Sequence, residues 1–239
     1  GVGINLPGLG AQPVVNGSFA DDKRTANTKN MSVTTSDTSS GEANNWCRAA
    51  DTLVFGLSGR GDDDVTATFT SMIFNSSGSP AQPITMTRIG HSPNTDGSTP
   101  NAFGDVFSEI WYTYNPYVYA TNATSNGTTV TVTLPISLKA GTVLKVYSGT
   151  GLFAGNTRVV ANVTNATQFL VDRTPATKLT NATICGGICA LFDNPASTSS
   201  STEFSLTRSS AAAKEWAGGF TCLAGVDATK INLVTSSGV

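Results

Sequence analysis

The stretch 128-TTVTVTL-134 shows most clearly how this chain folds. Val130, Val132 and Leu134 alternate with threonines, so apolar side chains fall on one face of an extended segment and hydroxyl groups on the other. Alternation with a period of two residues is typical of a half-buried β-strand. The dipeptide Asn126-Gly127 stands before it and indicates a tight turn. The sequence therefore predicts a strand that packs one face onto a core.

The next fifty residues repeat this design. Segments 142–147, 158–163 and 168–171 are rich in β-branched and aromatic residues, and Gly-rich turns at 139–141 and 148–151 separate them. Short strands joined by such turns are typical of small antiparallel barrels and sandwiches. We expect residues 121–184 to form an inserted β module of one of these two kinds.

The flanking segments predict a second β unit. The fold class we expect is mainly β, with an antiparallel β-sandwich or jelly-roll-like host domain around the inserted module. A long loop is expected from His91 to Gly104, and a single short helix from Ser210 to Ala217, stopped by Gly218-Gly219. The expected host strands are 14–19, 52–57, 65–74, 84–89, 106–114, 117–119, 203–207 and 231–234.

Three domain-level segments follow from this pattern. Residues 14–120 and 185–239 would form the host domain, and residues 1–13 would form an extended N-terminal arm. The arm is rich in Gly and Pro but carries Ile4, Leu6 and Leu9. These apolar residues favour contact with a neighbouring subunit, whose sheet edge the arm could extend. The alternative is a loose chain terminus.

The composition excludes several function classes. Charged residues make up 13% of the chain, about half of the usual share. The net charge is −2 without a basic cluster, so a nucleic-acid groove is not predicted. No run of 18 apolar residues occurs, so no membrane span is predicted. Ser and Thr together supply 60 of 239 residues, which suits β-rich proteins at particle or cell surfaces.

Four cysteines are present, Cys47, Cys185, Cys189 and Cys222. An even number permits two disulfides, which would tie the two host segments together. Free buried thiols are the first alternative. The second is a zinc site that uses the Cys185–Cys189 spacing, although the other two cysteines lie singly and far away.

Nothing in the sequence forms a catalytic constellation. His91 is the only histidine, so any triad must use it, and no nucleophile-elbow pattern accompanies it. Asp51, Asp105 and Glu109 could serve as paired glycosidase carboxylates only if the fold brought two of them together. We therefore predict no catalytic residues, no metal and no cofactor.

Two further groups of residues could act at a surface. The aromatic residues could pack in the core, contact another subunit or stack on sugar rings; they are Trp111, Tyr112, Tyr114, Tyr117 and Tyr119. Eight Asn-X-Ser/Thr motifs could accept glycans if the chain passes through a glycosylating export route. They begin at Asn16, Asn30, Asn75, Asn122, Asn126, Asn162, Asn165 and Asn181.

One run resembles a recurrent family of β modules. Residues 146–159 read VYSGTGLFAGNTRV and residues 167–171 read TQFLV. This Gly-Thr-Gly turn, with Ala-Gly and a β-rich return, is similar to modules of tailed-phage structural proteins and large surface adhesins. Phe153 stands where that pattern often has Pro. The resemblance implies a structural role on a virion or cell surface, and it carries no catalytic residues.

These observations together predict a non-enzymatic structural subunit of a repeating assembly, foremost a virion shell, decoration or tail protein. Its partners would be copies of itself, with other virion or surface proteins, and no nucleic acid. It would reside in a virion or at the cell surface. The alternatives are an extracellular filament or pilus subunit that donates its N-terminal strand, and a carbohydrate-binding adhesin module.

Overall fold

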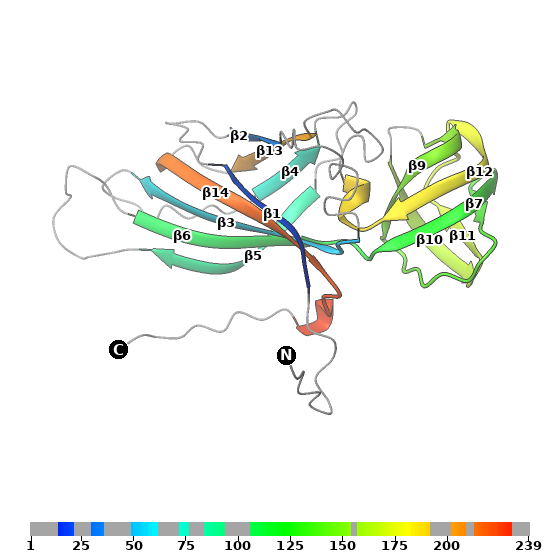
Figure 1. The fold of residues 1–239 in the computed structure, drawn as a ribbon, viewed down its shortest axis with the longest axis horizontal. Helices are drawn as coiled ribbons and strands as arrows, with labels where there is room; N and C mark the ends of the chain where they lie inside the picture. Colours follow the sequence, from blue (N-terminus) through cyan, green and yellow to red (C-terminus); the bar gives the residue numbers. More distant parts are fainter. Residues whose placement is uncertain are drawn as a thin grey trace.

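A computed structural model describes residues 14–21, 30–35, 49–61, 72–76, 84–93, 106–153, 157–191, 202–208 and 213–230. The described chain forms an eight-stranded sheet and a closed six-stranded barrel, in which every strand pairing is antiparallel. The two bodies lie side by side along the long axis of the molecule (Figure 1). The prediction of a mainly β, antiparallel protein is confirmed.

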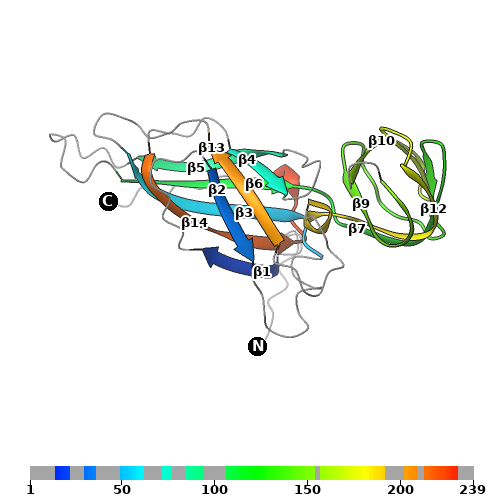
Figure 2. The same ribbon diagram turned by 90° about the horizontal axis from the view of Figure 1, so that it is seen from above.

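The sheet contains the strands that come before and after the barrel in sequence. Its edges, β1 and β2, contact each other, because the sheet curls and carries β4, β13 and β2 across the face of β14 and β3 (Figures 1 and 2). In spatial order the strands are β1 (Val14–Asp21), β14 (Ala213–Ala224), β3 (Thr52–Gly61), β6 (Val106–Tyr114), β5 (Ile84–Pro93), β4 (Met72–Ser76), β13 (Thr202–Arg208) and β2 (Asn30–Thr35).

Alternation along β3 explains how the sheet divides into an apolar and a polar face. Leu53, Phe55 and Leu57 are buried, whereas Gly56 and Ser58, which follow Phe55 and Leu57, are exposed. Successive side chains of a strand point to opposite faces, so burial follows every second residue. The paired strand β6 repeats the pattern, with Trp111 buried opposite Phe55.

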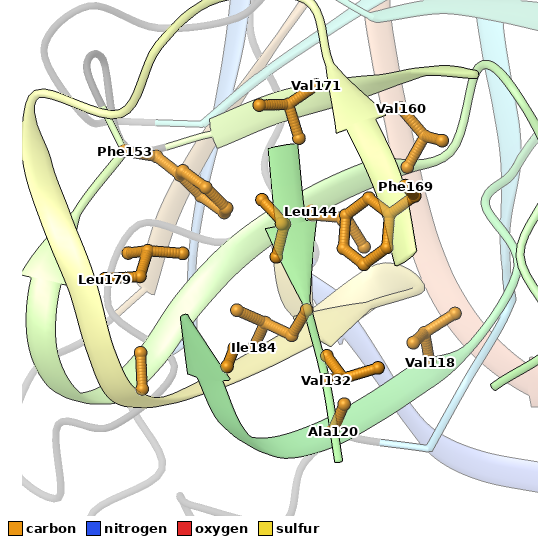
Figure 3. Packing of buried hydrophobic residues seen from close by; sticks show 13 residues of the cluster. Val118, Ala120, Val132, Leu144, Phe153, Val160, Phe169, Val171, Leu179 and Ile184 are labelled. Carbon is orange, nitrogen blue, oxygen red and sulfur yellow. The ribbon is translucent and has the colours of Figure 1, made fainter. Parts of the chain in front are cut away.

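The barrel is formed by β7 (Val118–Asn126), β8 (Thr129–Thr131), β9 (Val143–Leu152), β10 (Thr157–Asn165), β11 (Gln168–Val171) and β12 (Thr177–Gly186). Its order is β10-β11-β8-β7-β12-β9, and closure leaves no unpaired edge. Apolar side chains from these strands and the segments that join them fill the interior, as Figure 3 shows. The core consists of Val118, Ala120, Ala123, Val130, Val132, Leu144, Phe153, Val160, Phe169, Val171, Leu179, Ala182 and Ile184.

The barrel strands begin before residue 121 and end after residue 184, the predicted limits of the inserted module. Those limits, and the jelly-roll or sandwich character of the host, stay predictions. Residues 1–13 of the expected arm and the expected strand 231–234 lie outside the described residues. No helix within the described ranges is long and apolar enough to cross a membrane.

The predicted helix at 210–217 is wrong. Strand β14 begins at Ala213 and is hydrogen-bonded to β3 on one side and to β1 on the other. The helix propensity of a short Ala-Lys-Glu run amounts to tenths of a kcal/mol per residue. Residues 213–217 pair with β3, and the same ladder continues to Leu223, while β1 pairs on the other side from Gly218 onward. This strand pairing outweighs the preference.

Strand ends also differ from the prediction. Strand β9 continues through the expected turn at 148–151 and ends at Leu152. Gly149 allows β9 to approach β12 closely, because a Cβ there would lie 2.7 Å from the carbonyl oxygen of Asn181. Strand β5 extends to Pro93, so His91 lies in a strand and not in the expected loop. Strand β8 (Thr129–Thr131) is shorter than the motif 128–134 that predicted it.

Candidate functional site: the joint between sheet and barrel

The chain passes from the sheet into the barrel at Asn115 and leaves the barrel at Gly187. The side chain of Asn115 is buried at this joint. Its Nδ2 donates to the carbonyl oxygens of Val143 and Gly187, both at 2.9 Å, and its Oδ1 accepts from the Val143 amide at 2.9 Å. One amide side chain therefore binds the start of β9 and the exit segment to the end of the sheet.

Asp51 continues this network into the sheet. The Asn115 amide donates to the Asp51 carbonyl oxygen at 2.8 Å. The Asp51 carboxylate accepts from the amides of Gly225 at 2.9 Å and Val226 at 3.1 Å, and from Thr52 Oγ1 at 2.9 Å. Asp51 thus links the beginning of β3 to the end of β14, directly beside the joint.

The exit segment is packed as tightly as the entry. Gly187 is buried with φ +95°, and the Ile188 amide donates to the Ala50 carbonyl oxygen at 2.9 Å. The short 3-10 helix η1 (Ile188–Leu191) follows and contacts β9 and β12. It lies between the two bodies in Figure 1.

The cysteines do not form the two disulfides that an even count permits. Cys185 is a free, buried thiol that packs with Ala190 and Tyr147 beside the joint. Because this thiol is free, Cys185 is excluded from the disulfide candidates. Cys222 is buried and forms a disulfide. Its partner is not Cys185, the one other cysteine whose side chain is described, because Cys185 is a free thiol. Cys47 and the side chain of Cys189 lie outside the described part.

Tyr114 makes the joint sensitive to high pH. Burial raises the pKa of Tyr114 above its ordinary value of 10.0, and the negative charges of Asp51 and Asp227 raise this pKa further. The folded protein therefore holds the phenolic proton more tightly than the unfolded chain does. This contribution to stability is complete below pH 10 and is lost as the pH rises through the folded pKa.

We therefore expect Tyr114→Phe to reduce the loss of stability above about pH 10, because the variant has no phenol to ionise. Urea unfolding of both proteins from pH 8 to pH 11 measures the effect. The control is the comparison of the same two proteins at pH 8, where the phenol is protonated in both the folded and the unfolded chain, so the difference there reports only the loss of the hydroxyl group. Equal slopes for wild type and Tyr114→Phe would contradict the assignment.

A second polar cluster lies on the buried face of the sheet. The Glu109 carboxylate is 1% exposed and accepts from Trp111 Nε1 at 2.7 Å. Arg88 Nη1 lies 3.4 Å from Glu109 Oε1, and the guanidinium carbon stands 5.7 Å from the centre of the Trp111 ring. These contacts satisfy a buried charge and give Glu109 a structural role.

The carboxylates considered as a glycosidase pair are not brought together. In the β3–β6 register, Thr52 pairs with Tyr114 and Leu57 with Glu109, so Glu109 lies opposite a residue six positions along the chain from Asp51. Six residues of strand correspond to roughly 20 Å, whereas such a pair needs about 5–10 Å. Asp105 lies outside the described residues, as does the side chain of His91.

The predicted aromatic group is divided among three places. Trp111 is buried on the inner face of the sheet, and Tyr112 and Tyr114 are half-buried on the other face. Tyr117 and Tyr119 are each more than one third exposed at the barrel end of the joint. Tyr119 packs edge-on against Tyr147, with ring centres 6.1 Å apart.

Five of the eight glycosylation motifs have described side chains, and all five asparagines are exposed on the barrel. They are Asn122, Asn126, Asn162, Asn165 and Asn181. Asn122 and Asn181 have positive φ angles within strands β7 and β12, where the pairing shifts register. Asparagine adopts this conformation more readily than most residues. The side chains of Asn16, Asn30 and Asn75 lie outside the described part.

Comparison with family models, curated proteins and solved structures finds no match for this chain. Within the described ranges, no three His, Cys, Asp or Glu side chains stand together as a metal site would require. No sequence motif predicted the joint between sheet and barrel. Among the described residues, it is the most developed polar arrangement.

Proposed function

We propose that this protein is a structural subunit of a repeating assembly, foremost a virion shell, decoration or tail protein. The observation that carries the proposal is the buried Asn115 joint, which fixes a closed barrel to a curled sheet. Buried hydrogen bonds hold two bodies at one distance and orientation, which a subunit needs if its contacts are to repeat. The Gly-Thr-Gly resemblance of the barrel supports the same class.

The N-terminal segment would supply contacts between subunits. It leads directly into β1, which is hydrogen-bonded to β14 alone among the described strands. Ile4, Leu6 and Leu9 precede this edge strand, so an arm leaving it can reach a neighbouring sheet edge and pair there. This arrangement also suits the filament alternative, in which the arm is a donated strand.

Deletion of residues 1–13 should abolish assembly and leave the fold intact, because the deletion ends before the first residue of strand β1. Electron microscopy of native and truncated material measures assembly, and far-ultraviolet circular dichroism measures the fold. A shell or tail would support the virion assignment, and a helical polymer the filament. Assembly of the truncated chain at wild-type concentration would remove the arm from the proposal, and a native monomer would remove the assembly itself.

The carbohydrate-binding alternative has one observation in its favour. Tyr117 and Tyr119 keep part of their rings exposed beside Tyr147, and exposed tyrosines can stack on sugar rings. A glycan array tests it with Tyr119→Ala as the variant and Tyr112→Ala as the control on the sheet. Binding lost only in Tyr119→Ala would favour an adhesin over a purely structural subunit.

A further inference from the structure

The eight-stranded sheet ends at β2. This strand comes last in the sheet order, and within the described part of the chain it is hydrogen-bonded to β13 alone. An edge strand has a row of N–H and C=O groups that point away from its own sheet and can pair with another strand. The edge at β2 is therefore a place where the sheet can be extended.

Strand β2 lacks the features by which proteins protect an edge from such pairing. Its six residues, Asn30–Thr35, include no charged residue, no proline and no glycine. They pair with β13 in unbroken register. Charges, prolines and bulges are the usual protection of an edge. The opposite edge has two of these, because the register of β1 shifts between Val15 and Gly17 and the strand ends at Asp21. Strand β2 is thus the edge that favours a partner strand.

An apolar row of the sheet runs up to this edge. Ile84 of β5 pairs with Phe74 of β4. The row continues through Leu206 of β13 to Met31 of β2. Met86, two residues along β5 from Ile84, is buried. Alternate residues of a strand, and directly paired residues of neighbouring strands, share one face of a sheet. The row therefore belongs to the face that carries Met86, and a strand added to β2 would continue it.

The N-terminal arm has the sequence of a strand that fits this edge. The segment 2-VGINL-6 alternates, with apolar residues at Val2, Ile4 and Leu6. In an extended chain these three residues lie on one face. The segment is about as long as the six residues of β2. Pro7 ends the pattern, because proline has no N–H to donate to a ladder of strand hydrogen bonds.

We propose that the β2 edge of one copy receives residues 2–6 of a second copy as an added strand. The main chain of β2 would supply the hydrogen bonds, and the three apolar arm residues would extend the apolar face of the sheet. Neither residues 1–13 nor β2 contains a charged side chain. Pairing of the two segments therefore buries no charged side chain of either, which would be costly.

The arm is long enough to reach a neighbouring copy. Seven residues, 7–13, separate the proposed strand from β1. An extended chain of that length spans up to roughly 25 Å, which exceeds the distance of about 10 Å between two sheets packed face to face. The inference rests on the proposed repeating assembly, because the arm reaches a second copy only if one lies beside the first.

Hydrogen exchange of the full-length protein tests the site. In assembled wild type, amides of β2 should exchange roughly tenfold more slowly than in Ile4→Asp, which carries a charge on the apolar side of the arm. Asn5→Asp adds the same charge on the other side of the arm and should behave like the wild type. Assembly without protection of β2 would overturn this inference alone, whereas a native monomer would overturn the proposed assembly as well.

A synthetic peptide distinguishes the arm of a second copy from the arm of the same chain. A peptide of residues 1–13 should bind full-length Ile4→Asp, whose β2 edge should be vacant, and restore slow exchange in β2. The same peptide with Ile4→Asp should not bind. Slow exchange of β2 that persists in wild type diluted to a monomer would show pairing within one chain and overturn the proposal. Protection of β1 in place of β2 by the peptide would also overturn it.

Discussion

Gly187→Ala is expected to lower the free energy of unfolding by about 3 kcal/mol, one of the two largest effects on this protein. A Cβ at residue 187 would lie 2.5 Å from the Ala50 carbonyl oxygen and 3.2 Å from Tyr117 Cα. Both neighbours belong to the backbone, so no side-chain rotation relieves the contact. The Ala50 oxygen also accepts from the Ile188 amide, and moving it would weaken that hydrogen bond.

Gly141→Ala is the matched control for this change. Its φ of +88° is close to the +95° of Gly187, but nothing lies within 4 Å of the position that a Cβ would occupy. The control carries the cost of the backbone conformation alone, about 1–2 kcal/mol. Urea unfolding of both variants separates conformational strain from crowding. If Gly187→Ala and Gly141→Ala lose the same free energy of unfolding, the exit segment accommodates the added methyl group without a crowding penalty.

Periodicity found the barrel because its strands alternate regularly. The motif at 128–134 and the segments 158–163 and 168–171 lie in or overlap β8, β10 and β11. Strand β12 was missed, although it pairs with both β7 and β9. Its sequence TKLTNATICG contains an asparagine that interrupts the alternation and suggests a turn. In the structure Asn181 stays in the strand with φ +49°, which is a bulge-like irregularity and not a turn.

The joint could not be predicted, because its partners are distant in sequence. Asn115 binds Val143 and Gly187, which lie 28 and 72 residues further along the chain. A polar residue that follows a strand and precedes Pro116 reads as an ordinary turn residue. The one local signal is that Asp51 precedes β3 and Asn115 follows β6, and pairing of these two strands brings both residues to one end.

The burial of Arg158 could not be predicted from the sequence either. In the sequence it opens an apolar run, where a basic residue suggests the solvent-facing end of a strand. Barrel closure encloses that end, and its register with Leu144 turns the side chain inward. Burial of this charge follows from the closed topology, which no local pattern reports.

Asn115→Ala should destabilise the protein by about 2–4 kcal/mol, because three hydrogen bonds of a buried side chain disappear and the groups of Val143 and Gly187 lose a partner. The barrel keeps its own closed core, so it should remain folded when the joint fails. Urea unfolding should then show two transitions in the variant where the wild type shows one. Small-angle X-ray scattering should detect a wider range of molecular dimensions. The control is Asn162→Ala on the exposed side of β10, with an effect below about 0.5 kcal/mol.

Asn115→Asp tests the direction of these hydrogen bonds. The new carboxylate keeps the shape of the amide and can still accept from the Val143 amide, but it cannot donate to the carbonyl oxygens of Val143 and Gly187. Burial and the two facing carbonyl dipoles should raise its folded pKa above the usual 3.9 or so of an aspartate. Its deficit relative to wild type should therefore be smallest below about pH 4 and grow as the pH rises, since only the protonated form can donate. A deficit that does not change between pH 4 and pH 7 would show that the amide's donors contribute nothing, and that packing alone fixes the barrel to the sheet.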